Sequence, residues 1–198
     1  MEIFINNTKA DITLEDEKTV EDVLKGIETE FEKIDATIIG VSIDDEEIDA
    51  EQLSNRFSDL IENIKTLSIT TICKEDIVFY FKSINENLES IEKELTEIPV
   101  YLQSGKEKES TDIVKNFAET FDNFCKAITL SSLFADYFAN TKEKAENISE
   151  FLSDFAPILT DFENAFKEKD TVLIGDLSEY EIAPRIVKMK EFCTEYIK

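Results

Sequence analysis

The sequence predicts an α+β protein, in which a small N-terminal domain of strands around one helix is followed by an all-α antiparallel four-helix bundle. Up to residue 72, short β-branched and apolar runs alternate with turn residues and enclose one helical segment. From residue 73 onward, apolar residues recur every three or four positions, which keeps one side of an α-helix apolar. We therefore expect two domains, residues 1–72 and residues 73–198.

The N-terminal domain is expected to begin with a β-hairpin. Residues 2–5 are an apolar run, residues 6–9 supply turn residues, and residues 10–14 alternate again. Thr19 is expected to cap a helix that reaches Asp35, because Asp22 follows three residues later and apolar residues recur at helical spacing. Strands are expected at residues 37–43, 47–49 and 64–72, with a tight turn at residues 44–46 and an irregular or helical piece near residues 50–57.

This order of elements resembles ubiquitin and other β-grasp domains. The resemblance rests on Met1–Ile5, Ile12–Glu15, Thr19–Val23 and Thr66–Ile69, and it covers residues 1–72 only. It implies a mixed sheet wrapped around one helix, with the first and last strands adjacent and parallel. It does not imply conjugation, because the family's modifiers end in a flexible tail with two glycines, whereas the last strand here leads into a helix.

The first long helix of the second domain is expected from about Lys74 to Ser104, with a kink at Pro99 and an end at Gly105. Its apolar residues follow a 4,3 spacing that keeps them in one narrow stripe. They are Ile77, Phe81, Ile84, Leu88, Ile91, Leu95, Ile98 and Leu102.

Three more helices complete the predicted bundle. The second begins at a cap on Ser110 or Thr111 and reaches Phe138, and the third runs from a break at residues 140–141 to Phe166. A single helix of over fifty residues is the alternative for these two. The last covers residues 171–197 as two segments that meet at Pro184. One carries a stripe at Leu173, Leu177 and Tyr180, and the other at Ile186, Met189, Cys193 and Tyr196.

The charge of the chain argues against two classes of partner. Residues 1–72 hold 19 acidic and 6 basic side chains, and residues 73–198 hold 26 and 15, so both parts of a chain with net charge −24 are acidic. Such a surface repels phosphate backbones and anionic lipid headgroups. We expect no nucleic-acid partner and no membrane partner. We also expect a cytoplasmic protein, because no signal-peptide pattern follows Met1 and three dispersed cysteines suit reduced thiols.

No recognisable catalytic chemistry is present in the sequence. There is no histidine, the predicted inward positions of the helices are apolar, and the four glycines form no phosphate-binding loop. The acidic run at residues 44–49 could hold a hard cation, but a solvated turn explains it better, because the spaced ligands of a calcium loop are missing. We expect no cofactor, no metal and no catalytic residue.

Surplus aromatic residues are the remaining signal. Twelve of the 15 phenylalanines lie beyond residue 72, and several stand off the predicted core stripes. Such wide apolar faces either pack several neighbours in a four-helix core or form an apolar groove or self-association surface. A second cluster combines polar groups with an aromatic residue near Gly175. The candidate partner-binding residues are Phe79, Phe134, Phe151, Ile158, Asp176, Glu179 and Tyr180.

These observations predict a non-enzymatic interaction or scaffold protein that binds a protein partner, a second copy of itself included, through apolar helix faces. One alternative is a cytoplasmic export or assembly chaperone, whose topology is similar in shape to that of flagellar secretion chaperones. The other is an enzyme with a site between the domains, built from Asp176, Glu179 and Tyr180.

Overall fold

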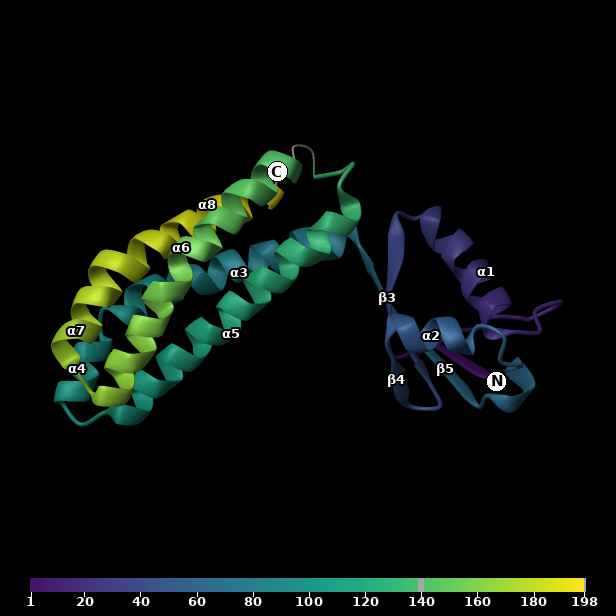
Figure 1. Cartoon of the computed structure of the whole chain (residues 1–198), viewed down its shortest axis with the longest axis horizontal. Helices are drawn as coiled ribbons and strands as arrows, with labels where there is room; N and C mark the ends of the chain where they lie inside the picture. The colour runs from purple at the N-terminus through teal and green to yellow at the C-terminus, as the bar shows by residue number, and fades with distance from the viewer. Residues whose placement is uncertain (139–140, 198) are drawn as a thin grey trace. The chain divides into compact units, whose positions relative to one another are not determined.

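The computed structural model describes residues 1–138 and 141–197, with side chains outside residues 141–145. The chain is an α+β protein, in which a five-stranded mixed sheet is followed by helices (Figure 1). It forms two compact units, Met1–Asp76 and Ile77–Lys198.

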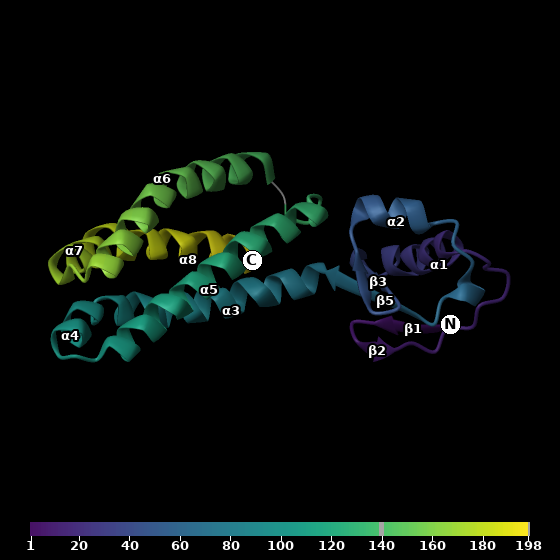
Figure 2. The ribbon, with the colours of Figure 1, turned by 60° about the horizontal axis from the view of Figure 1, so that its bottom comes forward.

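The sheet of the first unit has the strand order β2-β1-β5-β3-β4, of which β2, β1, β5 and β3 are labelled in Figure 2. Its strands are β1 (Glu2–Ile5), β2 (Thr8–Lys9), β3 (Ala36–Ile43), β4 (Glu46–Ile48) and β5 (Thr66–Cys73). β1 pairs in parallel with β5, and the other pairs are antiparallel. The expected parallel pairing of the first and last strands is therefore confirmed.

The second strand is shorter than predicted, which corrects the expectation of a strand over residues 10–14. Asn6 and Asn7 both have positive φ, 48° and 64°, as in the two-residue turns that suit β-hairpins. Pairing then ends after Thr8 and Lys9. Ile12 and Leu14 instead line a groove together with residues of helix α1 (Val20–Glu32), so their alternation does not mark a strand.

Helix α1 (Val20–Glu32) begins as predicted. The Thr19 hydroxyl accepts the backbone N–H of Asp22, and the Asp22 carboxylate accepts the backbone N–H of Thr19, which makes a capping box. The short helix α2 (Ala50–Arg56) starts with the same device on Asp49 and Gln52, and η1 (Ile61–Asn63) precedes β5. α1 packs its apolar side on the sheet, and the buried core comprises Ile3, Val20, Val23, Leu24, Ile27, Val41, Ile43, Ile48, Ile64, Leu67 and Ile69.

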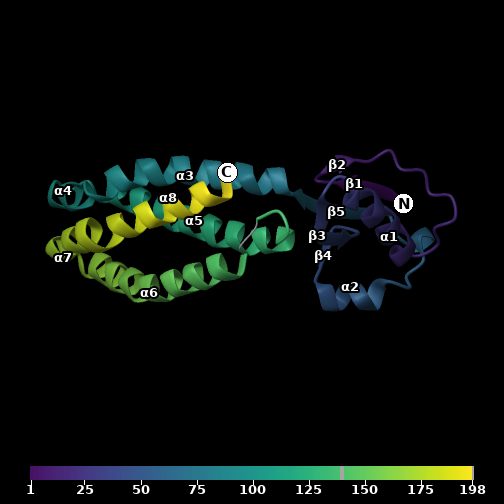
Figure 3. The same cartoon turned by 90° about the horizontal axis from the view of Figure 1, so that it is seen from above.

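The second unit is helical, and its long helices lie side by side (Figure 3). Its elements are α3 (Lys74–Leu95), α4 (Ile98–Gln103), α5 (Glu107–Ser131), η2 (Ser132–Phe134), α6 (Thr141–Glu168), α7 (Thr171–Asp176), η3 (Leu177–Ile182) and α8 (Ala183–Ile197). The predicted stripe of the first helix is confirmed from Ile77 to Ile98, since all seven of these side chains are buried, whereas Leu102 is half-buried. Aromatic rings from three segments meet at Tyr196, which stacks on Phe81 with ring centroids 4.3 Å apart and contacts Phe138.

The predicted kink at Pro99 and the predicted start of the second helix are both wrong. Pro99 does not kink a continuous helix, because α3 ends at Leu95 and Pro99 sits in the first turn of α4. Proline lacks the N–H that a helix interior needs, but it suits a helix start. The expected cap at Ser110 or Thr111 also fails, since α5 begins at Glu107 and Ser110 is buried inside it, donating to the Lys106 carbonyl at 3.3 Å. Gly105 ends the preceding segment as predicted, with φ of 75°.

The second and third predicted helices are separate helices. α5 ends at Ser131, earlier than the predicted Phe138, and α6 begins at Thr141. Asn140, at the predicted break, lies outside the described residues.

The last helix corrects the predicted meeting of two segments at Pro184. α7, the π-helical segment η3 and α8 follow one another without a gap, and the Ala183 N–H donates to the Ser178 carbonyl five residues earlier. The predicted stripe at Leu173, Leu177 and Tyr180 is wrong, because the buried residues there are Ile174, Ser178 and Ile182. The predicted stripe at Ile186, Met189, Cys193 and Tyr196 is confirmed as buried.

Candidate functional site

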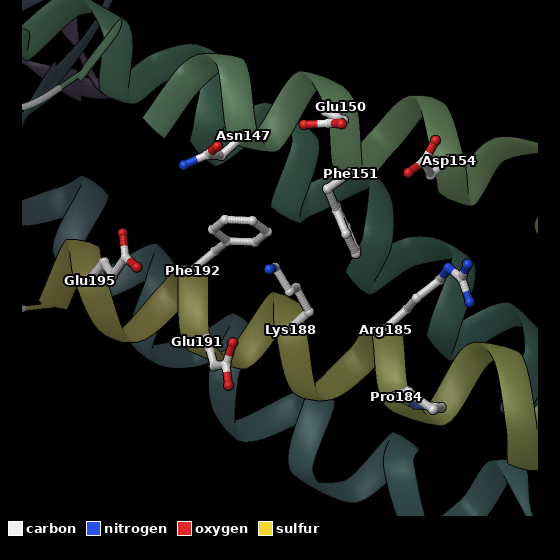
Figure 4. A pocket seen from close by; sticks show the side chains of 10 residues that line it. All are labelled: Asn147, Glu150, Phe151, Asp154, Pro184, Arg185, Lys188, Glu191, Phe192 and Glu195. Carbon is white, nitrogen blue, oxygen red and sulfur yellow. The ribbon is translucent and has the colours of Figure 1, made fainter. Parts of the chain in front are cut away.

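A groove of about 490 Å³ lies between α6 and α8 in the second unit (Figure 4). Each helix contributes one face, because its lining residues recur three or four positions apart. The lining residues are Asn147, Glu150, Phe151 and Asp154 from α6, and Pro184, Arg185, Lys188, Glu191, Phe192 and Glu195 from α8.

Two phenylalanines form the floor of this groove. The rings of Phe151 and Phe192 meet edge to face, with centroids 5.4 Å apart and planes at 66°. Behind them, Phe151 packs on the fully buried Phe155 at 5.6 Å, and Phe192 packs on Phe124 at 6.5 Å. Phe192 is only 6% exposed and Phe151 is half-buried. The floor is therefore an aromatic surface supported from the core.

The two cations of the groove already have partners within the chain. Arg185 donates from Nη1 to the Glu181 carboxylate at 2.7 Å and to the Glu181 carbonyl at 2.8 Å, and its guanidinium lies 5.7 Å from the Phe155 ring centroid. Lys188 Nζ lies 5.7 Å from the Phe192 ring centroid. These contacts hold both side chains against the floor and rim.

Exposed carboxylates outnumber the cations. Glu150 and Asp154 stand on α6, Glu191 and Glu195 stand on α8, and all four are exposed. Against Arg185 and Lys188, four acids leave the lining with a net charge of −2. In the part of the chain that the structure describes, Glu150, Asp154 and Glu191 make no ion pair. The arrangement is an aromatic floor between two acidic rims.

Of the candidate residues, Phe151 lines this groove and the others lie elsewhere. Ile158 is half-buried on α6 and Phe134 is half-buried in η2. Phe79, on α3, is 66% exposed. Phe79, Phe134 and Ile158 therefore do not line the groove with Phe151.

The three polar candidates lie near one another but outside the groove. Asp176, Glu179 and Tyr180 are exposed where α7 passes into η3. The charge of Glu179 and a hydrogen bond to it raise the pKa of Tyr180, and Asp176 adds to the effect. The phenol therefore stays protonated at neutral pH, which makes it a hydrogen-bond donor and not a base.

Sequence reasoning missed most of the groove. Phe192 was not singled out, and neither were the carboxylates and cations around it. One signal was available, since residues 184, 185, 188, 191, 192 and 195 share one helical face that mixes a phenylalanine with charges. Pairing that face with its partner on α6 requires the tertiary structure.

Other candidate chemistry is accounted for by local contacts. Among the described residues, no group of three or more histidine, cysteine or acidic side chains is placed to hold a metal ion. Asp44, in the acidic run, uses Oδ1 to accept the backbone N–H groups of Lys65 and Thr66 at 2.8 and 2.9 Å.

Burial raises the pKa of the Cys193 thiol to about 12, so this thiol is not a nucleophile at neutral pH. In the same described ranges, no helix is long and apolar enough to cross a membrane.

Comparison with known proteins gives two family matches and one relative. A family model described as Domain of unknown function (DUF8042) matches residues 80–192, and a model described as TP0873 N-terminal domain matches residues 1–73. A protein of Treponema pallidum (strain Nichols), described as an uncharacterized protein, is 30% identical over 184 residues, which cover 93% of this chain and 92% of the relative. No solved structure matches the chain.

Proposed function

We propose that this chain, which belongs to the family described as Domain of unknown function (DUF8042), is a non-enzymatic interaction protein. Its protein partner binds in the groove between α6 and α8. The observation that carries the proposal is the aromatic floor of Phe151 and Phe192 between exposed acidic rims. Grooves between two helices accept a helical segment of a partner, and well-supported aromatic residues supply much of the binding energy in such interfaces.

The proposal also covers the fold of each of the two domains. We propose that residues 1–72 are a β-grasp (ubiquitin-like) domain, which is supported by the parallel pair of β1 and β5 and by α1 packed on the sheet. We propose that residues 73–198 are an antiparallel four-helix bundle, which is supported by the four long helices α3, α5, α6 and α8. A cytoplasmic location belongs to the same proposal, and the free thiols of Cys73, Cys125 and Cys193 support it.

The alternative functions are weighed by the same geometry. An export or assembly chaperone is a narrower form of the proposal, because a client helix would occupy the same groove. The enzyme hypothesis used Asp176, Glu179 and Tyr180, which are exposed side chains outside the groove, and the raised pKa of Tyr180 keeps that phenol protonated. We therefore propose recognition and not catalysis.

Site-specific photo-crosslinking in the native host tests the proposal. A photoreactive amino acid replaces Glu150 on the groove rim, and in a matched control it replaces Glu86, an exposed residue on α3. We expect a discrete cross-linked protein from position 150 and none from position 86. The proposal fails if position 150 captures no protein in cells where the chain is folded and expressed at its natural level.

A further inference from the structure

We infer that the segment bound in the groove is a basic amphipathic helix of about three turns, which places one large apolar side chain on Phe151 and Phe192 and flanking Lys or Arg side chains on the acidic rims. This inference rests on the proposed function and names the class of partner.

The apolar part of the inference comes from the small area of the floor. Seven of the ten lining residues are polar or charged, and Phe192 is almost covered by its neighbours. The floor therefore takes one large side chain from the apolar face of the partner helix. A single anchor that meets a supported aromatic pair resembles the centre of a typical protein interface, with polar groups around it.

The charge of the partner follows from the rims. Glu150 and Asp154 are one helical turn apart on α6, and Glu191 and Glu195 are one turn apart on α8, so carboxylates line both sides of the floor. A helix with Lys or Arg on either side of its apolar anchor meets both rims. The field of a chain with net charge −24 also draws a basic segment toward the groove and repels an acidic one.

The cations in the lining do not change this conclusion. Arg185 already neutralises Glu181, and Lys188 lies over the Phe192 ring. An anionic ligand would have to break the Arg185 contacts and approach a lining with a net charge of −2. The same repulsion disfavours a second copy of this acidic chain as the occupant.

The length of the segment follows from α8. Its lining residues extend from Pro184 to Glu195, eleven residue steps, which is about 16 Å of helix. A partner helix of about three turns spans this length.

Three synthetic peptides test the inference against the full chain by fluorescence anisotropy. Each has about 14 residues, with a central phenylalanine and otherwise identical apolar positions. The polar positions are filled with Lys in the first peptide, Gln in the second and Glu in the third. We expect the Lys peptide to bind roughly tenfold more tightly than the Gln peptide and the Glu peptide to bind most weakly, with the Lys advantage shrinking as salt is added.

Two charge variants locate the binding. Glu150→Lys with Asp154→Lys alters the rim, and Glu86→Lys with Glu89→Lys alters exposed positions of α3, so both variants change the net charge from −24 to −20. We expect the rim variant to bind the Lys peptide about tenfold more weakly than the unchanged chain does. The α3 variant should lose much less affinity for this peptide.

Specific outcomes overturn the inference. Equal affinity of the Lys and Gln peptides, equal losses in the two variants, or no binding of any peptide would each rule out a basic amphipathic partner. A dimer in sedimentation that the rim variant dissociates would identify a second copy as the occupant instead. The cross-linking result at position 150 decides the proposed function separately, because it does not depend on the chemistry of the partner.

Discussion

The carboxylate of Asp44 joins the turn between β3 and β4 to the start of β5. Oδ1 accepts two backbone N–H groups, and the Asp44 N–H donates to the Thr66 carbonyl at 2.9 Å. The N–H of Thr66, and then that of Lys65, hold the pKa of Asp44 below its ordinary value. Asp44 also has a positive φ of 52°, which aspartate and asparagine tolerate better than most residues. Asp44 thus has a structural role, as does Asp49 of the same acidic run, which caps α2.

We expect Asp44→Asn to weaken the start of β5 at neutral pH, because it removes the charge from two hydrogen bonds and keeps the turn. The folded pKa is lowered, so the ionised carboxylate stabilises the fold above the ordinary value of 3.8, and this contribution is lost as the pH falls through the lowered value. Amide exchange at Lys65 and Thr66 should show lower protection in the variant, with the difference narrowing below pH 3.8. Asp45→Asn in the same turn is the control, and an equal loss there would contradict this role.

For two buried serines of the helical unit, we expect replacement by alanine to have opposite effects on stability. Among the described residues, Ser178 Oγ is buried and has no hydrogen-bond partner. Ser131 Oγ donates to the Ile128 carbonyl at 2.7 Å and also bonds the buried Tyr196 hydroxyl. Ser178→Ala should raise the free energy of unfolding by about 1 kcal/mol, and Ser131→Ala should lower it by about 1–2 kcal/mol. Urea unfolding followed by circular dichroism measures both, and destabilisation by Ser178→Ala would show that the hydroxyl has a partner.

At the scale of elements, the π-helical segment η3 explains the burial of the last helix. The buried residues Ile174, Ser178, Ile182 and Ile186 are each four positions apart. In an α-helix each such step rotates the side chain by about 40°, so the row would drift off the core. A wider turn reduces this drift and keeps the row inward. Pro184 lies just after it and cannot donate a helical hydrogen bond. The Arg185 side chain donates to the Glu181 carbonyl in the same turn.

The approach of α7 to α4 depends on Gly175. A Cβ at this position would lie 3.3 Å from Cγ of Pro99, whereas a Cβ at Gly26 in α1 would meet nothing within 4 Å. Gly175→Val should therefore lower the free energy of unfolding by about 1–3 kcal/mol through overpacking. Gly26→Ala should raise it by about 0.5–1 kcal/mol, because alanine favours the helix. Hydrogen exchange in α4, α7 and α1 separates the two effects, and unchanged protection in α4 and α7 of Gly175→Val would contradict the close contact.

At the scale of the whole molecule, repulsion between carboxylates opposes folding. The two parts of the chain carry −13 and −11, and most of the ion pairs in the described ranges are exposed. Exposed pairs contribute little to stability, so they do not offset this repulsion.

We expect the midpoint of thermal unfolding to rise by several degrees when sodium chloride is added to a low-salt buffer, because salt screens like charges. Calorimetry at a series of salt concentrations measures the shift. The variant with Glu86→Lys and Glu89→Lys should start from a higher midpoint and respond less to salt. A midpoint that falls with salt would show that attractive pairs dominate.

Local sequence is sufficient to predict the elements whose causes lie within a few residues. The capping box of Thr19 and Asp22, the positive-φ turns at Asn6–Asn7 and Asp44–Asp45, and the helix end at Gly105 depend on side chains next to the backbone that they satisfy. The stripe of α3 follows from helical spacing alone. Net charge follows from composition and does not depend on the fold.

Which side of a wide apolar face is buried, and which faces meet, depends on how the helices pack in three dimensions. Phe155 is buried against Phe117 and Phe121 of α5, whereas Phe151, on the same broad face of α6, contacts Phe192 of α8 and stays partly open. Of the predicted apolar candidates, Phe151 lines the groove. The opposite wall of the groove comes from residues of α8, more than 30 positions away from Phe151 in the sequence. Hydrophobic periodicity shows that a face needs a neighbour, but the choice of neighbour depends on how all the helices pack together.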